Sequence, residues 1–399
     1  MVLNLFFYAI LFIFSLLVLL GSVFFFKNRV GYRLPPSPMC LSIIGHMHFI
    51  DSVPYRFFHK LAIRYGPLIH LRLGSVPCIV VSSPEFAKEC LMINELTFGS
   101  RPVTISIDYL TYNSAGFAFA HFGTVWSFMK KVLMSELLGG QALKKHCHIR
   151  NNEIQNLVQL LLKKSVNGER VNVSEELMKL SNNIITQMML SMKYSASKEK
   201  GEEVRSLVRE VTKIFNQFNV SDFFGFLRNL DLQGFLRKST DIKGRYDILL
   251  ERIIKEREEV RNKKKGKPTS DVGNNKVKDF LDILLDVSED MNSEVKLNRD
   301  NVKAFLLYQA SRVNKDVRGQ HFEFKAFGTG RRGCPGIWLS LLEGPAVLAA
   351  IIQCLDWEVI SSNGSKVIDM TDRPGLTVPM ANPILLDLRT RFDPFNLDM

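Results

Sequence analysis

The stretch F-G-T-G-R-R-G-C-P-G, residues 327–336, is the most informative part of this 399-residue sequence. Four of its ten residues are glycines, and they flank a cysteine, Cys334. Glycine lets a backbone turn tightly and pass close to another group, because it has no Cβ. The other five cysteines are scattered without a C-x-x-C pair, so no disulfide framework is indicated. The loop therefore singles out Cys334 as the cysteine with a chemical role.

Cys334 meets the requirements of a cysteine that binds haem iron. A thiolate ligand gives the iron electron density that favours cleavage of an O–O bond. Nearby amides or positive charges must keep that sulfur deprotonated, and the acidic haem propionates need cationic partners. Arg332, two residues before the cysteine, can reach a propionate, and Phe327 can lie against the ring. A helix expected over 336–354 would direct the positive end of its dipole toward the thiolate.

The same ten residues resemble the haem-binding signature of cytochromes P450, F-x-x-G-x-R-x-C-x-G. Five positions match, namely Phe327, Gly330, Arg332, Cys334 and Gly336. The alternative, a glycine-rich loop with a bystander cysteine, is disfavoured by so many matches in so short a window. The resemblance implies haem b (iron protoporphyrin IX) with Cys334 as the axial ligand, and oxygen insertion driven by NADPH through a separate reductase.

A second motif, V-W-S-F-M-K-K at 125–131, resembles the helix of this family whose tryptophan and basic residue bind a haem propionate. Trp126 and Lys130 are four residues apart, so they share one face of a helix. Lysine keeps the positive charge at the second position but lacks the bidentate fork of arginine. Trp126 and Lys130 therefore join Arg332 as candidate partners of the propionates.

The first 26 residues carry no charge and are long enough for a transmembrane helix, which needs about 20 apolar residues. A cleavable signal peptide is the alternative, but the positive charges follow the apolar run instead of preceding it. Those charges predict a cytosolic body, and the closely spaced prolines before residue 39 predict a stiff hinge over 27–38. An anchor followed by L-P-P-S-P resembles the entry of endoplasmic-reticulum members of the family. The net charge of +12 suits an anionic membrane or an acidic partner such as the reductase.

The rest of the chain predicts one domain over 39–399, mainly α with a small β part. The resemblance implies that this domain has the cytochrome P450 fold without most of its central helix and the E-x-x-R region that follows. A hairpin is expected over 67–83, because two β-rich runs flank a Gly-Ser turn. Segment 103–119 is expected to be a loop that forms part of the substrate pocket. Long helical patterns are expected at 125–138, 148–164, 174–191, 202–215, 241–263 and 277–290, and again from Asn298, which can cap the next helix.

Several short motifs resemble those of one plant group within the family. M-S-E-L-L-G-G, F-N-V-S-D-F, L-D-L-Q-G-F and D-V-R-G-Q-H-F-E-F are similar to segments of flavone and isoflavone synthases, pterocarpan hydroxylases and β-amyrin hydroxylases. These enzymes oxidise flavonoid or triterpene skeletons. The resemblance therefore implies a small hydrophobic substrate from plant secondary metabolism.

The resemblance is interrupted after residue 307. Segment 297–307 begins the central helix of the family, yet D-V-R-G-Q-H-F-E-F already starts at Asp316. The A-G-x-D/E-T, E-x-x-R and P-E-R-F-like motifs that belong between them are missing, so an internal deletion is predicted near 308–315. The E-x-x-R strings at 202–205 and 258–261 lie far upstream and receive no role, and no catalytic residue is assigned.

Two functions follow from this sequence. The first is a haem-thiolate monooxygenase whose turnover is impaired by the deletion. The second is a non-catalytic, membrane-anchored remnant that arises from a splice variant, a pseudogene or a faulty gene model. A nucleic-acid-binding protein is disfavoured, because no basic patch is interleaved with aromatic residues and no zinc-ligand spacing is present.

Overall fold

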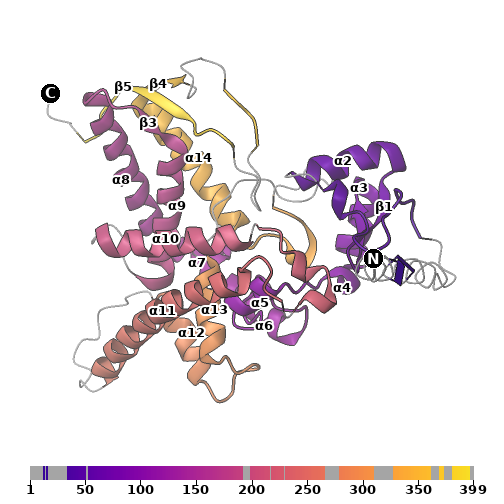
Figure 1. Ribbon diagram of the computed structural model, residues 1–399. Coiled ribbons are helices and arrows are strands. Elements are labelled where there is room, and N and C mark those ends of the chain that lie inside the picture. Colours follow the sequence, from indigo (N-terminus) through magenta and orange to yellow (C-terminus); the bar gives the residue numbers. More distant parts are fainter. Residues whose placement is uncertain are drawn as a thin grey trace, which may run out of the picture. The chain divides into compact units, whose positions relative to one another are not determined.

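The computed structural model describes residues 12–13, 15–16, 34–50, 53–191, 198–215, 217–228, 230–265, 278–309, 327–360, 368–372 and 380–395. These residues form two compact units (Figure 1). The first unit contains Met1–Ile93 and Asn219–Gln233, and the second contains Asn94–Phe218 and Gly234–Met399. Residues 310–315 of the predicted deletion join and most of the predicted anchor lie outside the described residues; residues 12–13 and 15–16 are helical.

The first unit is built around an antiparallel hairpin, as predicted. Strands β1 (Leu68–Leu73) and β2 (Val76–Val81) pair so that Leu73 lies opposite Val76. Gly74 turns the chain with a positive φ of 59°. A Cβ at this position would lie 2.5 Å from the carbonyl oxygen of Phe223, so only glycine fits. Helix α2 (Pro54–Tyr65) precedes the hairpin, and α3 (Pro84–Lys88) follows it, with the Ser83 hydroxyl accepting from the Phe86 amide.

Helices make up most of the second unit. They are α4 (Glu95–Phe98), α5 (Ile105–Leu110), α6 (Thr124–Leu133), α7 (Gly140–Lys145), α8 (Cys147–Val166), α9 (Val173–Leu190), α10 (Lys198–Phe215), α11 (Phe235–Lys265), α12 (Phe280–Glu289), α13 (Arg299–Gln309) and α14 (Ile337–Cys354). A three-stranded antiparallel sheet in the order β3-β5-β4 joins Val171–Asn172, Leu385–Thr390 and Leu355–Ile360. The prediction of a mainly α fold with a small β part is confirmed.

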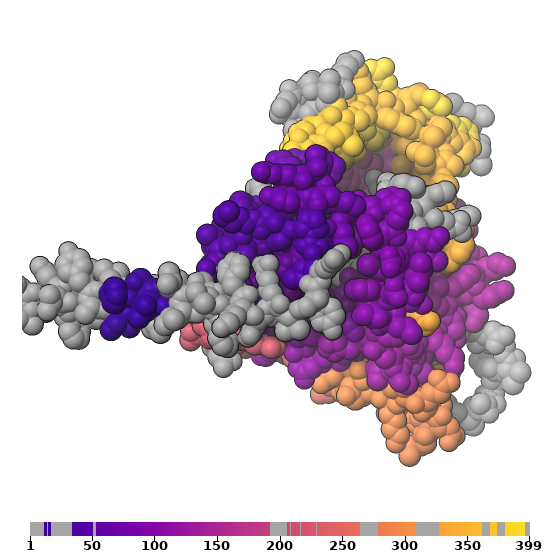
Figure 2. All heavy atoms as spheres, turned by 90° about the vertical axis from the view of Figure 1, so that its right-hand side faces the viewer, coloured from indigo at the N-terminus to yellow at the C-terminus, as the bar shows by residue number. Residues whose placement is uncertain are grey.

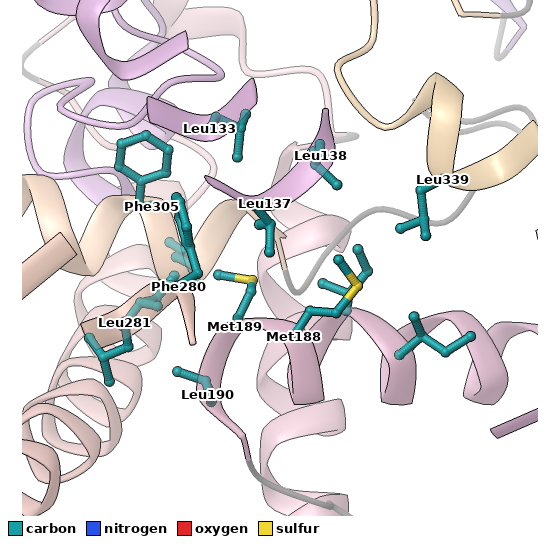
Figure 3. Packing of buried hydrophobic residues seen from close by; sticks show 14 of the residues in the cluster. Leu133, Leu137, Leu138, Met188, Met189, Leu190, Phe280, Leu281, Phe305 and Leu339 are labelled. Carbon is teal, nitrogen blue, oxygen red and sulfur yellow. The ribbon is translucent and has the colours of Figure 1, made fainter. Parts of the chain in front are cut away.

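The core of the second unit lies where α6, α9, α12 and α13 meet. Leu133, Met188, Phe280 and Phe305 are fully buried there (Figure 3). Each large apolar side chain removed from water contributes roughly 1.5–3 kcal/mol. Leu339 of α14 belongs to the same cluster, which ties the C-terminal helix to the middle of the chain.

Helix ends follow local capping chemistry. The Asn298 side chain accepts from the Asn301 amide at 2.9 Å, as predicted, and the Asn301 side chain accepts from the Asn298 amide at 3.0 Å. The expectation of a simple loop over 103–119 is wrong in part, because α5 occupies 105–110. The Thr104 hydroxyl accepts from the Ile107 amide at 3.3 Å and starts this helix. The expected helix over 125–138 is divided, since α6 ends at Leu133 and a π-helical segment, Met134–Leu138, follows.

Candidate functional site

The Cys334 loop is folded by its own backbone. The Cys334 amide donates to the carbonyl oxygen of Phe327 at 2.8 Å, and the Gly333 amide donates to Gly330 at 3.1 Å. Gly328 and Gly330 both have a φ of +67°, which is strained for any residue with a side chain. Two of the glycines quoted above are therefore required by the turn itself.

The Cys334 side chain is half-buried and stands just before the start of α14. Gly336 forms the N-cap of that helix. A Cβ built on Gly336 would come within 3.8 Å of the Cys334 sulfur, so glycine leaves the space beside the sulfur open. The free amides at a helix N-terminus favour a negative charge nearby. This position suits an anionic sulfur.

Arg332 fixes the loop to the segment that precedes α6. Its Nε donates to the carbonyl oxygen of Gly99 at 2.7 Å, its Nη1 donates to Phe117 at 3.3 Å, and its Nη2 donates to Ala120. One planar guanidinium thus binds three backbone carbonyls through three separate nitrogen atoms, a fork that the single ammonium of lysine lacks.

Trp126 of α6 lies beneath that guanidinium. Only 2% of the residue is exposed, and Cζ of Arg332 lies 4.4 Å from the ring centroid, which is the geometry of a cation–π contact. The indole Nε1 donates to the carbonyl oxygen of Phe117 at 3.1 Å. The Phe117 ring stacks on the indole with 5.6 Å between the centroids.

Lys130 approaches the same indole from one turn further along α6. Its Nζ lies 5.3 Å from the ring centroid and donates to the carbonyl oxygen of Arg331 at 2.6 Å. Burial, and then the positive charge of Arg331, lower the pKa of this amine. An anion placed here would be stabilised by Lys130 and by the arginine pair.

The structure therefore gathers the predicted residues in one place. Trp126, Lys130 and Arg332 meet beside the loop that carries Cys334, although they come from two segments about 200 residues apart. In this structure the side-chain nitrogens of these three residues donate to backbone carbonyl oxygens. Phe327 is buried and contributes the carbonyl that receives the Cys334 amide.

Two participants were not predicted. Arg331 forms an ion pair with Glu95 of α4 and lies over the Phe122 ring at 5.7 Å. The doubled arginine in the loop was a sequence signal for it. Phe117 stacks on Trp126, and nothing in its sequence neighbourhood indicated that contact.

Comparison with known proteins agrees with this arrangement. The sequence model of the cytochrome P450 family matches residues 35–310 and 308–386. The chain belongs to the cytochrome P450 family. Cytochrome P450 93B16 of Glycine max is 36% identical in an alignment of 484 positions, covering 90% of this chain and 92% of the relative. The 3,9-dihydroxypterocarpan 6A-monooxygenase of the same species is 32% identical over 97% of this chain and 99% of the relative. The beta-amyrin 24-hydroxylase of Glycine max is 29% identical, over 95% of this chain and 96% of the relative.

Membership of the P450 family implies a haem–thiolate cofactor, and the described residues fit that group. The loop that carries the half-buried sulfur meets one indole N–H and two cationic side chains, and a glycine keeps the side of the sulfur clear. This is the donor set that a ring carrying an iron and two propionates requires. The family relationship is thus matched by the chemistry of this P450's own loop.

Proposed function

We propose that this chain is built to bind haem b through Cys334 and to insert oxygen into a flavonoid, isoflavonoid or triterpenoid, and that an internal deletion impairs it. The observation that carries the proposal is the gathering of Arg332, Lys130 and Trp126 beside the Cys334 loop. Nothing in a glycine-rich loop with a bystander cysteine requires a cation and an indole from a helix about 200 residues away to meet its arginine.

Each residue has a defined task in this proposal. Cys334 ligates the iron, and Gly336 and Gly330 allow the ring to approach. Arg332, Lys130 and the Trp126 N–H exchange their present carbonyl partners for the propionates. The bound haem supplies the oxygen-activating iron, and the protein orients it and excludes water.

The comparison supports the deletion. Ninety per cent of a 399-residue chain is about 359 residues, yet the alignment with cytochrome P450 93B16 needs 484 positions. About 125 positions of that alignment therefore carry no residue of this chain. The two segments that match the family model also meet at 308–310, where the sequence motifs break off.

The surface of α14 supports the same conclusion. Among the described residues this is the one helix long and apolar enough to span a membrane by length and composition. Its outward-facing side chains Trp338, Leu342 and Leu348 are 48%, 48% and 54% exposed, and the golden C-terminal segment lies at the surface in Figure 2. An apolar face of this size is normally covered. Loss of a covering segment explains its exposure.

The substrate class comes from the names of the relatives. One is named a 3,9-dihydroxypterocarpan 6A-monooxygenase and another a beta-amyrin 24-hydroxylase. We extend that class to this chain and assign the segment 103–119, which carries α5, to the substrate pocket. We also propose the endoplasmic-reticulum membrane as the location, with residues 1–26 as anchor and NADPH–cytochrome P450 reductase as the electron donor.

A pair of proteins tests the proposal. Two chains are expressed in microsomes, each with and without Cys334→Ala. One is the original chain, and the other carries, after residue 308, the segment that its relatives have and this chain lacks. We expect a strong thiolate band in the reduced, carbon-monoxide difference spectrum of the restored chain, and a weak one for the original chain. A band that survives Cys334→Ala would refute the ligand assignment, and a full-strength band in the original chain would refute the impairment.

The second candidate is a non-catalytic remnant. The interruption at 308–310 favours it for this particular chain. Sequencing the transcript across the join distinguishes a real product from a faulty gene model.

A further inference from the structure

Glu343 is the one charged residue of α14, and it faces inward. The helix has 18 residues, and its exposed positions carry apolar side chains apart from Gln353. Glu343 is only 8% exposed, whereas Trp338 and Leu342 nearby are about half exposed. This is the reverse of the usual amphipathic pattern, in which charge faces water. Such an arrangement requires an explanation for the buried acid.

The two carboxyl oxygens of Glu343 have different surroundings. The hydroxyl of Ser181 on α9 donates to Oε2 at 3.3 Å. Oε1 is buried and has no hydrogen-bond partner among the described residues. A buried carboxylate with an unpaired oxygen is costly, but a neutral acid in the same place costs far less. The geometry therefore favours a protonated Glu343.

Charged groups on the neighbouring elements do not remove this preference. Helix α8 contributes Arg150, whose Nη1 donates to the Leu143 carbonyl oxygen at 2.6 Å. It also contributes Glu153, whose two oxygens accept from the side-chain amides of Asn156 and Asn183. Strand β4 contributes Asp356, which is paired with Arg391 at the surface, and exposed Glu358.

The net result is a raised pKa. Burial raises the pKa of Glu343 to about 7, although the Ser181 hydroxyl and the charge of Arg150 both act to lower it. The acid is therefore neutral in mildly acidic solution and becomes charged above neutrality.

Glu343 lies nine residues after Cys334 on the helix that continues the Cys334 loop. Arg332 holds the loop on one side, and α14 holds it on the other. We propose that Glu343 is a positioning residue that works as a neutral acid, holding α14 against α8 and α9 while it is protonated and loosening the helix when it ionises. Any effect of this loosening on Cys334 as a haem ligand rests on the proposed function, but the docking of α14 does not.

The sign of the effect follows from linkage. The pKa of Glu343 is higher when α14 is docked than when the helix is open. The acid therefore stabilises docking to its full extent when the pH is below the ordinary glutamate pKa near 4.5. That stabilisation is lost as the pH rises through about 7. Opening of α14 should thus increase by on the order of tenfold between pH 5.5 and pH 8.

Hydrogen exchange on the full chain, without added haem, tests this. Peptides covering 337–354 are compared at pH 5.5 and 8 after correction for the intrinsic exchange rate. We expect protection to fall roughly tenfold in the original chain, and to be the same at both pH values in Glu343→Gln, which mimics the neutral acid. Glu256→Gln, an exposed glutamate of α11, serves as the matched control and should behave like the original chain.

A second variant keeps the test decisive if Glu343→Gln fails to fold. Ser181→Ala removes a hydrogen bond that lowers the pKa of Glu343, so the midpoint of the pH effect should move upward. Infrared spectroscopy should show a protonated-carboxyl band that titrates near neutrality and shifts in this variant. An unchanged pH effect in Glu343→Gln, or no upward shift in Ser181→Ala, would overturn the proposal. Neither measurement depends on haem, so a failure of the Glu343 proposal can be distinguished from a failure of the proposed function.

Discussion

The guanidinium of Arg332 lies over the indole of Trp126, with 4.4 Å between Cζ and the ring centroid. The contact joins the Cys334 loop to α6, and both residues also bind the carbonyl oxygen of Phe117. A cation held over a buried ring is stabilised by the ring quadrupole, and its remaining donors are directed at backbone oxygens. The loop is thus fixed to α6 by contacts that need no bound ligand.

Replacement of Arg332 tests how much its contacts contribute to the free energy of unfolding. Arg332→Ala leaves the carbonyls of Gly99, Phe117 and Ala120 without their donor, and we expect a loss of about 2–4 kcal/mol in the free energy of unfolding. Arg332→Lys retains the charge but has one donor head, so it should lose an intermediate amount. Chemical denaturation followed by circular dichroism measures both. No loss in Arg332→Lys would show that the fork geometry has no role.

Trp126 offers a separable prediction, because its packing and its hydrogen bond can be removed one at a time. Trp126→Phe keeps an aromatic ring but loses the bond to Phe117, and should cost about 1–2 kcal/mol. Trp126→Ala empties a site that is only 2% exposed and should cost about 3–5 kcal/mol. Thermal unfolding of the two variants checks the order. Trp357→Phe, at a partly exposed tryptophan of β4, is the control and should change stability little.

A chain of ion pairs between α11 and α13 makes the second unit sensitive to acid. Glu251 accepts from Arg299 and is paired with Lys303 at 3.0 Å. The hydrogen bond from Arg299 lowers the pKa of Glu251 to about 2. The stabilisation is therefore present above the ordinary value near 4.5 and is lost as the pH falls toward 2. Because the pair is partly exposed, we expect only about 1 kcal/mol.

Unfolding by urea at pH 7 and pH 3 measures that contribution. Glu251→Gln should reduce stability at pH 7 and have a smaller effect at pH 3. Glu256→Gln should have little effect at either pH. A loss in Glu251→Gln that is equal at both pH values would contradict the linkage.

The turn after α5 has three successive non-glycine residues with positive φ. They are Tyr112, Asn113 and Ser114, at 55°, 60° and 56°. The left-handed conformation costs roughly 1–2 kcal/mol for most L-residues and less for asparagine. Asn113→Gly should therefore change stability by less than about 1 kcal/mol, whereas Asn113→Val should destabilise by more than that. Thermal unfolding checks the pair, and a neutral Asn113→Val would show that the turn adjusts freely.

Local chemistry determined much of the secondary structure from the sequence. The hairpin and the cap at Asn298 were predicted correctly, because a Gly-Ser turn and a side-chain oxygen at a helix start act within a few residues. Helix ends that depend on more distant contacts were less accurate. Helix α11 begins at Phe235 and not near 241, and Phe235 is buried in the core.

The candidate site divides in the same way. The sequence by itself determined the family, the glycine turns of the Cys334 loop and the helix positions of Trp126 and Lys130, because these depend on spacing along the chain. Only the tertiary structure decided that Arg332 lies on Trp126, that Arg331 pairs with Glu95, and that Glu343 is buried with one oxygen unpaired. These features arise from packing between segments up to about 240 residues apart, and no local pattern specifies which side chains such packing will bring together.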